Sequence, residues 1–572
     1  MLYLKDIRKC IIPILVLSIL LSSMGFCFSA NYDCQQGKWM ACTLIFFATL
    51  IALFKNPFHH TRINYSLLPI IACSQVADLF SQCWTISSLT WILAIFCFVI
   101  LCQRITNIEW FYTIAISLLV VLSMDFFRSC GVNESWGLQI FDNSAGEASS
   151  LVMGLSCMMI TMPSLRKISS VRIHMIEITM ISCMALPSIA LLFSHSRTGF
   201  VASLLSIAIF FAFQLKSKIS PKIWFAFGVG ICLSAICIAT LLYFRNPNSV
   251  RGRFLTYQVV LQMIAEHPWL GWGSNALDAH YMASQARFLH FLSDSHIYRW
   301  LAGDVVRPFN EILNGLMCYG FTCMLVAICM ILLIWKNLAQ SQRCKILPVL
   351  IAWTALGMTS YPSYYPYACL LLAGSFGNLF KEEGRMVHPQ GTIISKNEKT
   401  FSLFILVGGI YMAILQVYKA QVKEEWLERF ATEDCVSSFD SQAEIPSIIS
   451  KDIDVRYTYA VNLNLSGEYS KSQDVLNSLK GELQSYDTEI LAGDNTLSMH
   501  QWNAANQHFQ LAHEMVPVRF MPLFGQMQVC LSRGDSIGAH QIAKAILLKK
   551  VKIDSEDIHF IKSEARKALG TN

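Results

Sequence analysis

Long apolar segments recur along residues 1–420, and they restrict how this chain can fold more than any other feature. A helix that crosses a bilayer needs about 20 mostly apolar residues, and thirteen segments approach that length. Backbone polar groups inside a bilayer must find their partners within the segment, so these segments are expected to be helices. The segments are 11–29, 39–54, 66–82, 88–103, 110–127, 147–163, 173–194, 200–215, 223–243, 309–335, 346–360, 364–380 and 401–418.

The composition changes after about residue 420, where polar and charged residues become frequent. Of the 572 residues, 54% are hydrophobic and only 14% are charged, whereas soluble domains carry about 25% charged residues. We therefore predict an all-α fold, with a polytopic membrane helix bundle of about 12–13 spans in 1–420 and a soluble helical domain in 421–572. The net charge is +6, with basic residues at the ends of apolar runs, a pattern that argues against a nucleic-acid partner.

The distribution of lysine and arginine predicts the topology. These residues favour cytoplasmic loops, and the short loops on the other side carry only Lys38, Arg128 and Arg197. The N-terminus is therefore expected in the cytoplasm and the tail on the outer side. The first apolar segment resembles a signal peptide, but the spans that follow favour a retained helix. The 20 cysteines lie mostly in apolar runs without metal-ligand spacing, so we expect no metal.

One long polar loop, 244–308, interrupts the apolar segments and lies on the predicted outer side. Its stretch VRGRFLTYQVVLQMIAEHP has apolar residues at helical spacing, and Pro268, Gly271 and Gly273 then interrupt the pattern. Loops of this length in compact domains are usually functional or disordered, and the aromatic content argues against disorder. We expect a surface helix followed by a glycine-rich turn.

The tail shows an internal period near 34 residues. Its signals are small residues at 472, 505 and 539, larger apolar residues at Tyr469, Trp502 and Ile537, and glycines at 467 and 534. This spacing is typical of tetratricopeptide repeats, which bind peptides or partner proteins. The alternative is a plain helical bundle.

Several arginines are expected at the outer face. Arg197 lies in the short polar turn His195–Gly199 between two apolar runs, and the other four are Arg251, Arg253, Arg299 and Arg307. Guanidinium groups bind phosphate in a bidentate manner and stay charged, so the group suits a diphosphate at the lipid–water boundary. For Arg251, Arg287 and Arg299 taken singly, a headgroup contact or a local ion pair is the preferred explanation.

A carboxylate begins a late apolar segment and is a candidate general base. Glu311 follows Asn310 at the start of that segment, where it can accept a proton from a substrate hydroxyl. Alternatively, Glu311 simply favours the helix N-terminus. The loop histidines His280, His290 and His296 are other candidate bases.

Three motifs, in this order, resemble the O-antigen ligase and polymerase (Wzy-C-like) superfamily of bacterial envelope glycosyltransferases. They are the S-R-T-G turn, the R-G-R-F…P-W-L-G-W-G-S-N run and the N-E-I-L…Y-G-F start of a late span. The resemblance covers 150–400 in detail and 1–420 in its layout of spans. It implies a GT-C-like architecture and glycan transfer from an undecaprenyl-diphosphate carrier at the outer face of the inner membrane. It implies neither a metal nor a cofactor.

The resemblance also assigns roles to particular residues. Arg197 matches the arginine of the turn motif, Arg253 the arginine that begins the loop helix, and Gly271 and Gly273 the glycine turn. Where the family often has a histidine before the late asparagine, this chain has Phe309. The base is therefore expected to be Glu311 or a loop histidine such as His296, unless the reaction needs no strong base.

We therefore expect an O-antigen ligase-type glycosyltransferase in the bacterial inner membrane with a periplasmic tail. The acceptor would be the lipid A core or a protein, and the tail would hold an acceptor or a protein partner. One alternative is a polysaccharide polymerase that extends carrier-linked glycan. Another is a transporter of lipid-linked sugars, which predicts charges in mid-span and repeated sets of spans. A third is a non-catalytic scaffold, which gives Arg197 no role.

Overall fold

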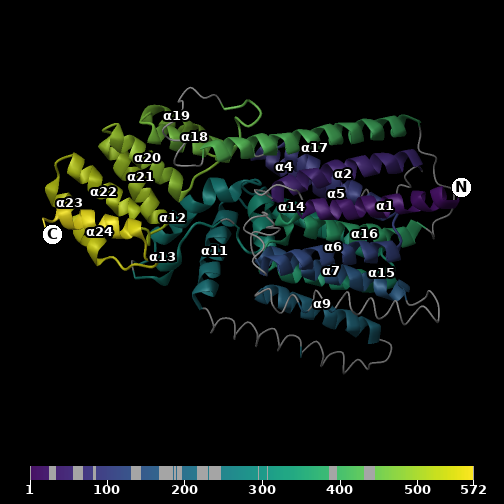
Figure 1. Cartoon of the computed structure of the whole chain (residues 1–572). Coiled ribbons are helices and arrows are strands. Elements are labelled where there is room, and N and C mark those ends of the chain that lie inside the picture. The colour runs from purple at the N-terminus through teal and green to yellow at the C-terminus, as the bar shows by residue number, and fades with distance from the viewer. Residues whose placement is uncertain are drawn as a thin grey trace. The chain divides into compact units, whose positions relative to one another are not determined.

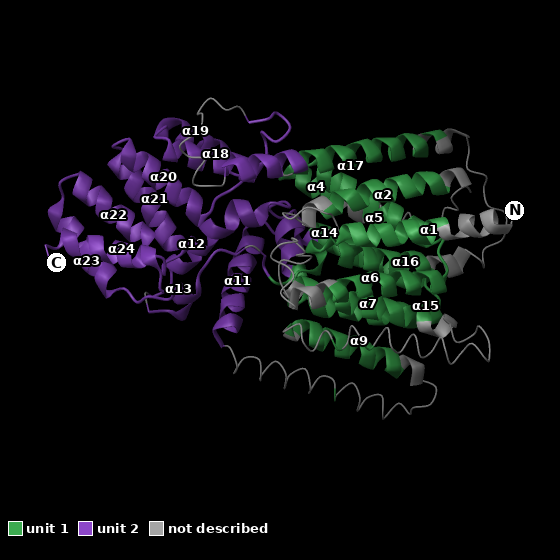
Figure 2. Cartoon of the chain, viewed as in Figure 1, with its two compact units in different colours: residues 1–241, 309–312, 322–420 green, residues 242–308, 313–321, 421–572 purple. Residues whose placement is uncertain are grey.

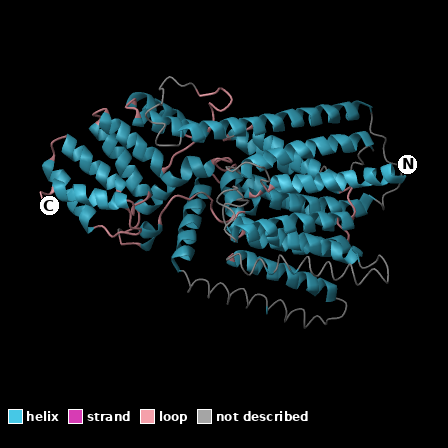
Figure 3. Cartoon of the chain, viewed as in Figure 1, coloured by secondary structure: helices cyan, strands magenta, loops and turns pink. Residues whose placement is uncertain are grey.

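The computed structural model describes eight stretches and a tail (Figure 1). They are residues 2–24, 34–55, 68–81, 85–129, 144–165, 196–215, 247–384, 396–430 and 445–570, without 294 and 306, together with the isolated residues 185, 189 and 230. Every regular element in these stretches is a helix (Figure 3). The fold is therefore all-α, as predicted.

The chain divides into two compact units (Figure 2). Unit 1 comprises 1–241, 309–312 and 322–420, and unit 2 comprises 242–308, 313–321 and 421–572. The long loop, predicted as part of the membrane domain, belongs in the structure to the same unit as the tail.

Unit 1 is a bundle of long apolar helices around an aliphatic and aromatic core. Its helices are α1 (Leu2–Ser23), α2 (Cys34–Lys55), α4 (Leu68–Phe80), α5 (Ile86–Cys102), α6 (Asn107–Ser129), α7 (Ser144–Leu165), α9 (Arg197–Leu215), α15 (Gln340–Gly357) and α16 (Pro366–Gly384). Helices α14 (Glu311–Asn337) and α17 (Lys396–Phe430) contribute residues to both units. Hydroxyl groups add polar links: Ser206 Oγ lies 2.8 Å from Ser156 Oγ on α7 and donates to the carbonyl of Pro348 on α15.

Eleven of the thirteen predicted apolar segments coincide with a helix of the structure. The other two, 173–194 and 223–243, fall almost entirely outside the described residues. By length and composition, Glu311–Asn337 and Ser402–Phe430 are suited to cross a membrane, and five described helices are apolar but shorter. Only 22% and 17% of the apolar windows of the two long helices are buried, unlike the core helix of a soluble protein. That these helices cross a bilayer, and in which direction, stays a prediction.

In unit 2, the long loop folds into helices that share a core with the tail. These helices are α11 (Pro247–Glu266), the π-helical η1 (Leu277–Tyr281), α12 (Met282–His290) and α13 (Ile297–Leu301). Val259, Met263 and Tyr281 are fully buried in one cluster with Ala512 and Met515 of the tail. The buried side chain of Gln285 accepts a hydrogen bond from the Tyr281 hydroxyl and donates to the carbonyl of Met515. The buried side of α11 therefore packs on η1, α12 and α13, and α12 in turn packs on α21 of the tail. Phe254 and Leu261 of α11 are each 52% exposed.

The tail forms three helical hairpins and a last helix. The helices are α18 (Ile453–Leu465), α19 (Tyr469–Leu479), α20 (Tyr486–Ser498), α21 (Trp502–Met515), α22 (Met521–Ser532), α23 (Ser536–Leu548) and α24 (Glu556–Ala568). Each hairpin turns at a residue with positive φ: Gly467 at 82°, His500 at 61° and Gly534 at 75°. In each turn the next residue donates its N–H to the carbonyl five positions earlier (Glu468 to Leu463, Gln501 to Thr496, Asp535 to Cys530). The three turns therefore share one helix-terminating geometry.

The three small residues predicted at equivalent repeat positions do occupy equivalent places in their hairpins, whereas Ile537 does not match Tyr469 and Trp502. Ser472, Ala505 and Ala539 are all fully buried in the second helix of their hairpins. Tyr469 and Trp502 begin their helices, but Ser536 begins the third, and Ile537 is 75% exposed. The proposed equivalence of Ile537 is therefore wrong by one residue. Membership of the tetratricopeptide family stays a prediction.

Helix α14 is broken at Gly320, and the glycine-rich turn of the long loop fills the break. Gly320 has φ 67° and ψ −177°, which interrupts the helical hydrogen bonds. The carbonyls of Met317 and Cys318 instead accept from the N–H groups of Trp272 and Gly273, both at 2.9 Å. In return, the N–H of Phe321 donates to the carbonyl of Pro268 at 2.8 Å. Backbone groups left without a partner by the break are thus satisfied by the loop.

The close approach requires glycine on both sides. Gly271 has φ 72°, and a Cβ there would lie 2.5 Å from the carbonyl of Cys318. A Cβ at Gly320 would overlap the carbonyl of Trp269. The two glycines therefore determine whether the loop and the broken helix can join.

We expect Gly271→Ala to lower the free energy of unfolding by about 2–4 kcal/mol, because positive φ and backbone overlap both oppose a side chain. The measurement is thermal unfolding of the full-length protein in detergent. The matched control is Gly252→Ala in α11, where an added Cβ meets nothing within 4 Å and alanine favours the helix. If Gly271→Ala and Gly252→Ala had the same midpoint of thermal unfolding, the contact between the loop and α14 would not contribute to stability as proposed.

Candidate functional site

Arg197 begins α9, directly after a residue that caps the helix. Ser196 Oγ accepts a hydrogen bond from the N–H of Gly199 at 3.3 Å, the contact that N-terminal capping serines commonly make. The side chain of Arg197 and the preceding His195 lie outside the described residues. A cation is electrostatically disfavoured at a helix N-terminus, whereas an anion is favoured there. An arginine in this position is therefore compatible with an anion that contacts both the guanidinium group and the helix N-terminus.

Glu311 begins α14 and is held by the loop before α16. Its Oε1 accepts two hydrogen bonds from Ser363, one from the N–H at 3.0 Å and one from the hydroxyl at 2.6 Å. Asn310 Oδ1 accepts from the N–H of Ile312 at 3.0 Å and caps the helix. Ser363 lies in the short helix η2 (Pro362–Tyr364). The carboxylate is therefore fixed in orientation at the start of the helix.

An aromatic cluster lies beside these residues and was missed by the sequence analysis. Its members are Phe309, Tyr361, Tyr364 and Tyr365, with neighbouring ring centroids 5.4–6.1 Å apart. Phe309 has φ 54°, an uncommon conformation for a bulky residue and one that often accompanies function. The run YPSYYPY, 361–367, at the start of the predicted span 364–380 was the available signal.

The loop arginines differ in what holds them. Arg251 and Arg253 lie half-buried in the first turns of α11. Arg299 donates to the carbonyls of Leu289 and Leu292 at the end of α12, at 3.1 and 3.3 Å, so it stabilises a helix terminus. Arg307 follows α13.

Arg287, considered above as a local ion pair, lies 3.0 Å from Glu266. The loop arginines belong to unit 2, whereas Arg197 and Glu311 belong to unit 1. Their convergence on one diphosphate stays a prediction.

The loop histidines have distinct environments. His296 caps α13 and its Nδ1 accepts from the N–H of Tyr298 at 3.2 Å, so that nitrogen already has a partner. The ring of His280 lies 4.5 Å from that of Trp272. Burial, with smaller contributions from His267 and Arg287, lowers the pKa of His280 below its usual value of 6.5. His280 is therefore neutral at physiological pH.

No group of three histidine, cysteine, aspartate or glutamate side chains within the described stretches could hold a metal ion.

Residues 182–328 match the family model of O-antigen ligase. The matched segment is about a quarter of the chain and includes Arg197, α11, the glycine turn and Glu311. No curated protein matches the sequence significantly. The O-antigen ligase match supports the resemblance predicted from the three motifs, since all three lie within it. The hairpins of the tail lie outside it.

One carboxyl group in the tail has a strongly perturbed pKa for a structural reason. Burial raises the pKa of Asp494 in α20 from 3.8 to about 6. The folded state therefore binds this proton more tightly than the unfolded chain does. The stability that the protonated group contributes is complete below about pH 3.8 and is lost as the pH rises through about 6.

Asp494→Asn is therefore expected to raise the free energy of unfolding by about 1–3 kcal/mol at pH 8 and by little at pH 4. Thermal unfolding of the full-length protein at the two pH values measures the difference. Asp474→Asn, at an exposed position of α19, is the control and should change neither midpoint. If Asp494→Asn raised the unfolding midpoint equally at pH 4 and pH 8, the raised pKa of Asp494 would not be the cause of the stabilisation.

Proposed function

We propose that the chain is an O-antigen ligase-type glycosyltransferase that moves a glycan from an undecaprenyl-diphosphate carrier to an acceptor hydroxyl. The reaction would take place at the periplasmic face of the bacterial inner membrane. The observation that carries the proposal is the O-antigen ligase match over 182–328. The all-α fold and the apolar helices α14 and α17 support a membrane setting.

The proposed reaction exchanges one bond to the anomeric carbon for another. The acceptor oxygen forms a bond to this carbon while the bond from carbon to diphosphate oxygen breaks. The hydroxyl proton passes to a base, and the diphosphate leaves on its lipid with one additional negative charge. Catalysis then requires cations at the leaving group and a base at the acceptor.

Arg197 is the proposed ligand of the diphosphate. Its place at the N-terminus of α9 adds backbone N–H groups and the helix dipole to the guanidinium charge. Arg251, Arg253 and Arg307 are further candidates for the diphosphate or the glycan. Arg299 is a weaker one, because two carbonyls already bind its guanidinium group.

Glu311 is the proposed base. Its carboxylate accepts two hydrogen bonds from Ser363, which fix it at the start of α14 and within the matched segment. His296 is the other candidate, but its Nδ1 already accepts from Tyr298. In this proposal Phe309, where the family often has histidine, serves to pack against Tyr361 at 5.6 Å.

The proposed acceptor is the lipid A core or a protein, because the helical tail offers a surface that could hold either. Lipopolysaccharide gels, a glycoprotein blot and the lengths of carrier-linked chains separate these acceptors from the growing glycan that a polymerase would extend.

Arg197→Ala is expected to abolish glycan transfer in cells at matched expression and to accumulate carrier-linked glycan, as a deletion does. Arg197→Lys keeps the charge but not the bidentate contact, so it should retain partial activity. The control is Arg533→Ala, at an exposed position after α22, which should match wild type. Wild-type glycans in Arg197→Ala cells would overturn the diphosphate role, and unchanged glycans in the deletion strain would overturn the transferase.

Glu311→Gln is expected to lower kcat about 10²–10⁴-fold with little change in KM, because glutamine accepts the Ser363 hydrogen bonds but not a proton. Ser363→Ala removes the 2.6 Å hydrogen bond from the Ser363 hydroxyl to Glu311, and it should lower kcat less than Glu311→Gln does. Transfer by the purified protein in detergent measures both, with the exposed Glu468→Gln as control. A wild-type kcat for Glu311→Gln would assign the base elsewhere.

A further inference from the structure

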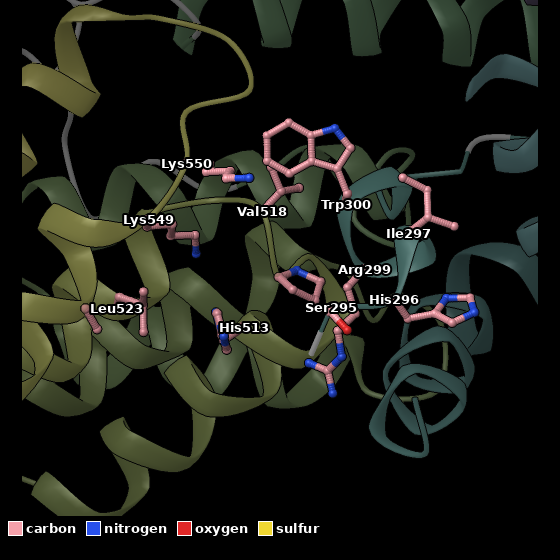
Figure 4. A pocket seen from close by; sticks show the side chains of 12 residues that line it. Ser295, His296, Ile297, Arg299, Trp300, His513, Val518, Leu523, Lys549 and Lys550 are labelled. Carbon is pink, nitrogen blue, oxygen red and sulfur yellow. The ribbon is translucent and has the colours of Figure 1, made fainter. Parts of the chain in front are cut away.

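A cavity of about 680 Å³ lies within unit 2, between α13 of the long loop and helices α21–α23 of the tail (Figure 4). Its lining contains neither Arg197 nor Glu311, the two residues on which the proposed reaction depends. Its volume is within the range of about 300–1,000 Å³ typical of small-ligand sites.

The lining of the cavity is cationic. It contains Arg299, Lys549 and Lys550, together with the imidazoles of His296 and His513. None of the twelve described lining residues is a carboxylate. A ligand in the cavity would therefore be attracted if it carried negative charge.

Two of the cations are held in place before any ligand binds. Arg299 donates to the carbonyls of Leu289 and Leu292. Lys549 Nζ donates to the carbonyl of Arg519 at 2.8 Å and lies 5.2 Å from the ring of Phe520. Burial lowers the pKa of Lys549 to about 8, so the ammonium is still mostly charged at pH 7. An ammonium held in place, such as that of Lys549, loses little side-chain entropy on binding an anion.

Apolar side chains line the same cavity. They are Trp300, Ile297, Val518 and Leu523 (Figure 4). The backbone at Trp300 is fixed because Lys552 Nζ donates to its carbonyl at 2.9 Å. The face of an indole ring is electron-rich and attracts the C–H groups of a pyranose ring.

We infer that this cavity binds an anionic saccharide, with sugar rings against Trp300 and a carboxylate or phosphate group near Lys549 and Lys550. A cavity of this volume that contains Trp300 together with Lys549 and Lys550 suits a short charged glycan segment. An acidic peptide would use the charge but gain nothing specific from the indole ring. The role of the cavity as a subsite for the transferred or accepting glycan rests on the proposed function, whereas the binding itself does not.

The test measures the binding of labelled probes to the full-length protein in detergent, with fluorescence anisotropy as the readout. The charged probes are tri-galacturonic acid and a phosphorylated maltotriose, which separate carboxylate from phosphate. The comparison probes are neutral maltotriose and a triglutamate peptide of matched charge. We expect a charged saccharide to bind at least about tenfold tighter than either comparison probe in about 0.1 M salt. The advantage should shrink in about 1 M salt, where the Debye length falls from about 10 to about 3 Å.

Variants assign the binding to the cavity. Trp300→Ala should weaken it about tenfold and Trp300→Phe much less, because phenylalanine keeps an aromatic face. Lys550→Gln, at an exposed position where folding is not at risk, should weaken it about 3–10-fold. Lys544→Gln, on α23 but outside the cavity, should bind as wild type.

Three results would overturn the inference. One is equal affinity for charged and neutral saccharides, and another is equal affinity for Lys550→Gln, Trp300→Ala and Lys544→Gln. The third is triglutamate binding as tightly as the charged saccharides, which would make the cavity a peptide or general anion site. Arg197→Ala protein should bind the probes normally, so a failure of the transferase proposal is distinguishable from a failure of this one.

Discussion

The backbone pairing at the break of α14 is the interaction on which the ordering of the long loop depends. Gly320 ends the regular hydrogen bonding of the helix, and the loop at Pro268–Gly273 supplies replacement partners through three backbone bonds. Because backbone groups left unpaired in a buried site are costly, the break and the loop stabilise each other. The long loop thereby acquires a fixed attachment to α14.

The long loop is also fixed at its other side. Its buried residues share a core with α20 and α21, and the N–H of Gln484 donates to the carbonyl of Asp278 in the loop at 2.9 Å. Arg519 adds an ion pair to Asp304 at 2.6 Å. The loop and the hairpins therefore form one folded unit, which explains how a loop of this length can be ordered without a core of its own.

Charge and hydrogen bonding explain why polar residues are placed where the apolar helices begin. Arg197 and Glu311 each occupy the first position of a helix, where backbone N–H groups lack helical partners. A carboxylate suits that position by itself. An arginine is less favourable there by itself, because the backbone N–H groups and the guanidinium group both carry positive charge. The Ser363 hydrogen bonds, together with the tyrosines on either side of Ser363, restrict the movement of the Glu311 side chain at the start of α14.

Spacing along the chain was sufficient to predict the helical fold, most helix positions and the buried small residues of the hairpins. Apolar runs and the period near 34 are local patterns, so they can be read without knowing which segments meet. The same patterns indicated Arg197, Glu311 and the glycine turn as candidates. Three features became visible only in the folded chain: Gly271 meets the backbone near Gly320, Ser363 holds Glu311, and the loop shares a core with the tail. These contacts join residues far apart in sequence, and their specificity lies in backbone geometry and packing that no local pattern records.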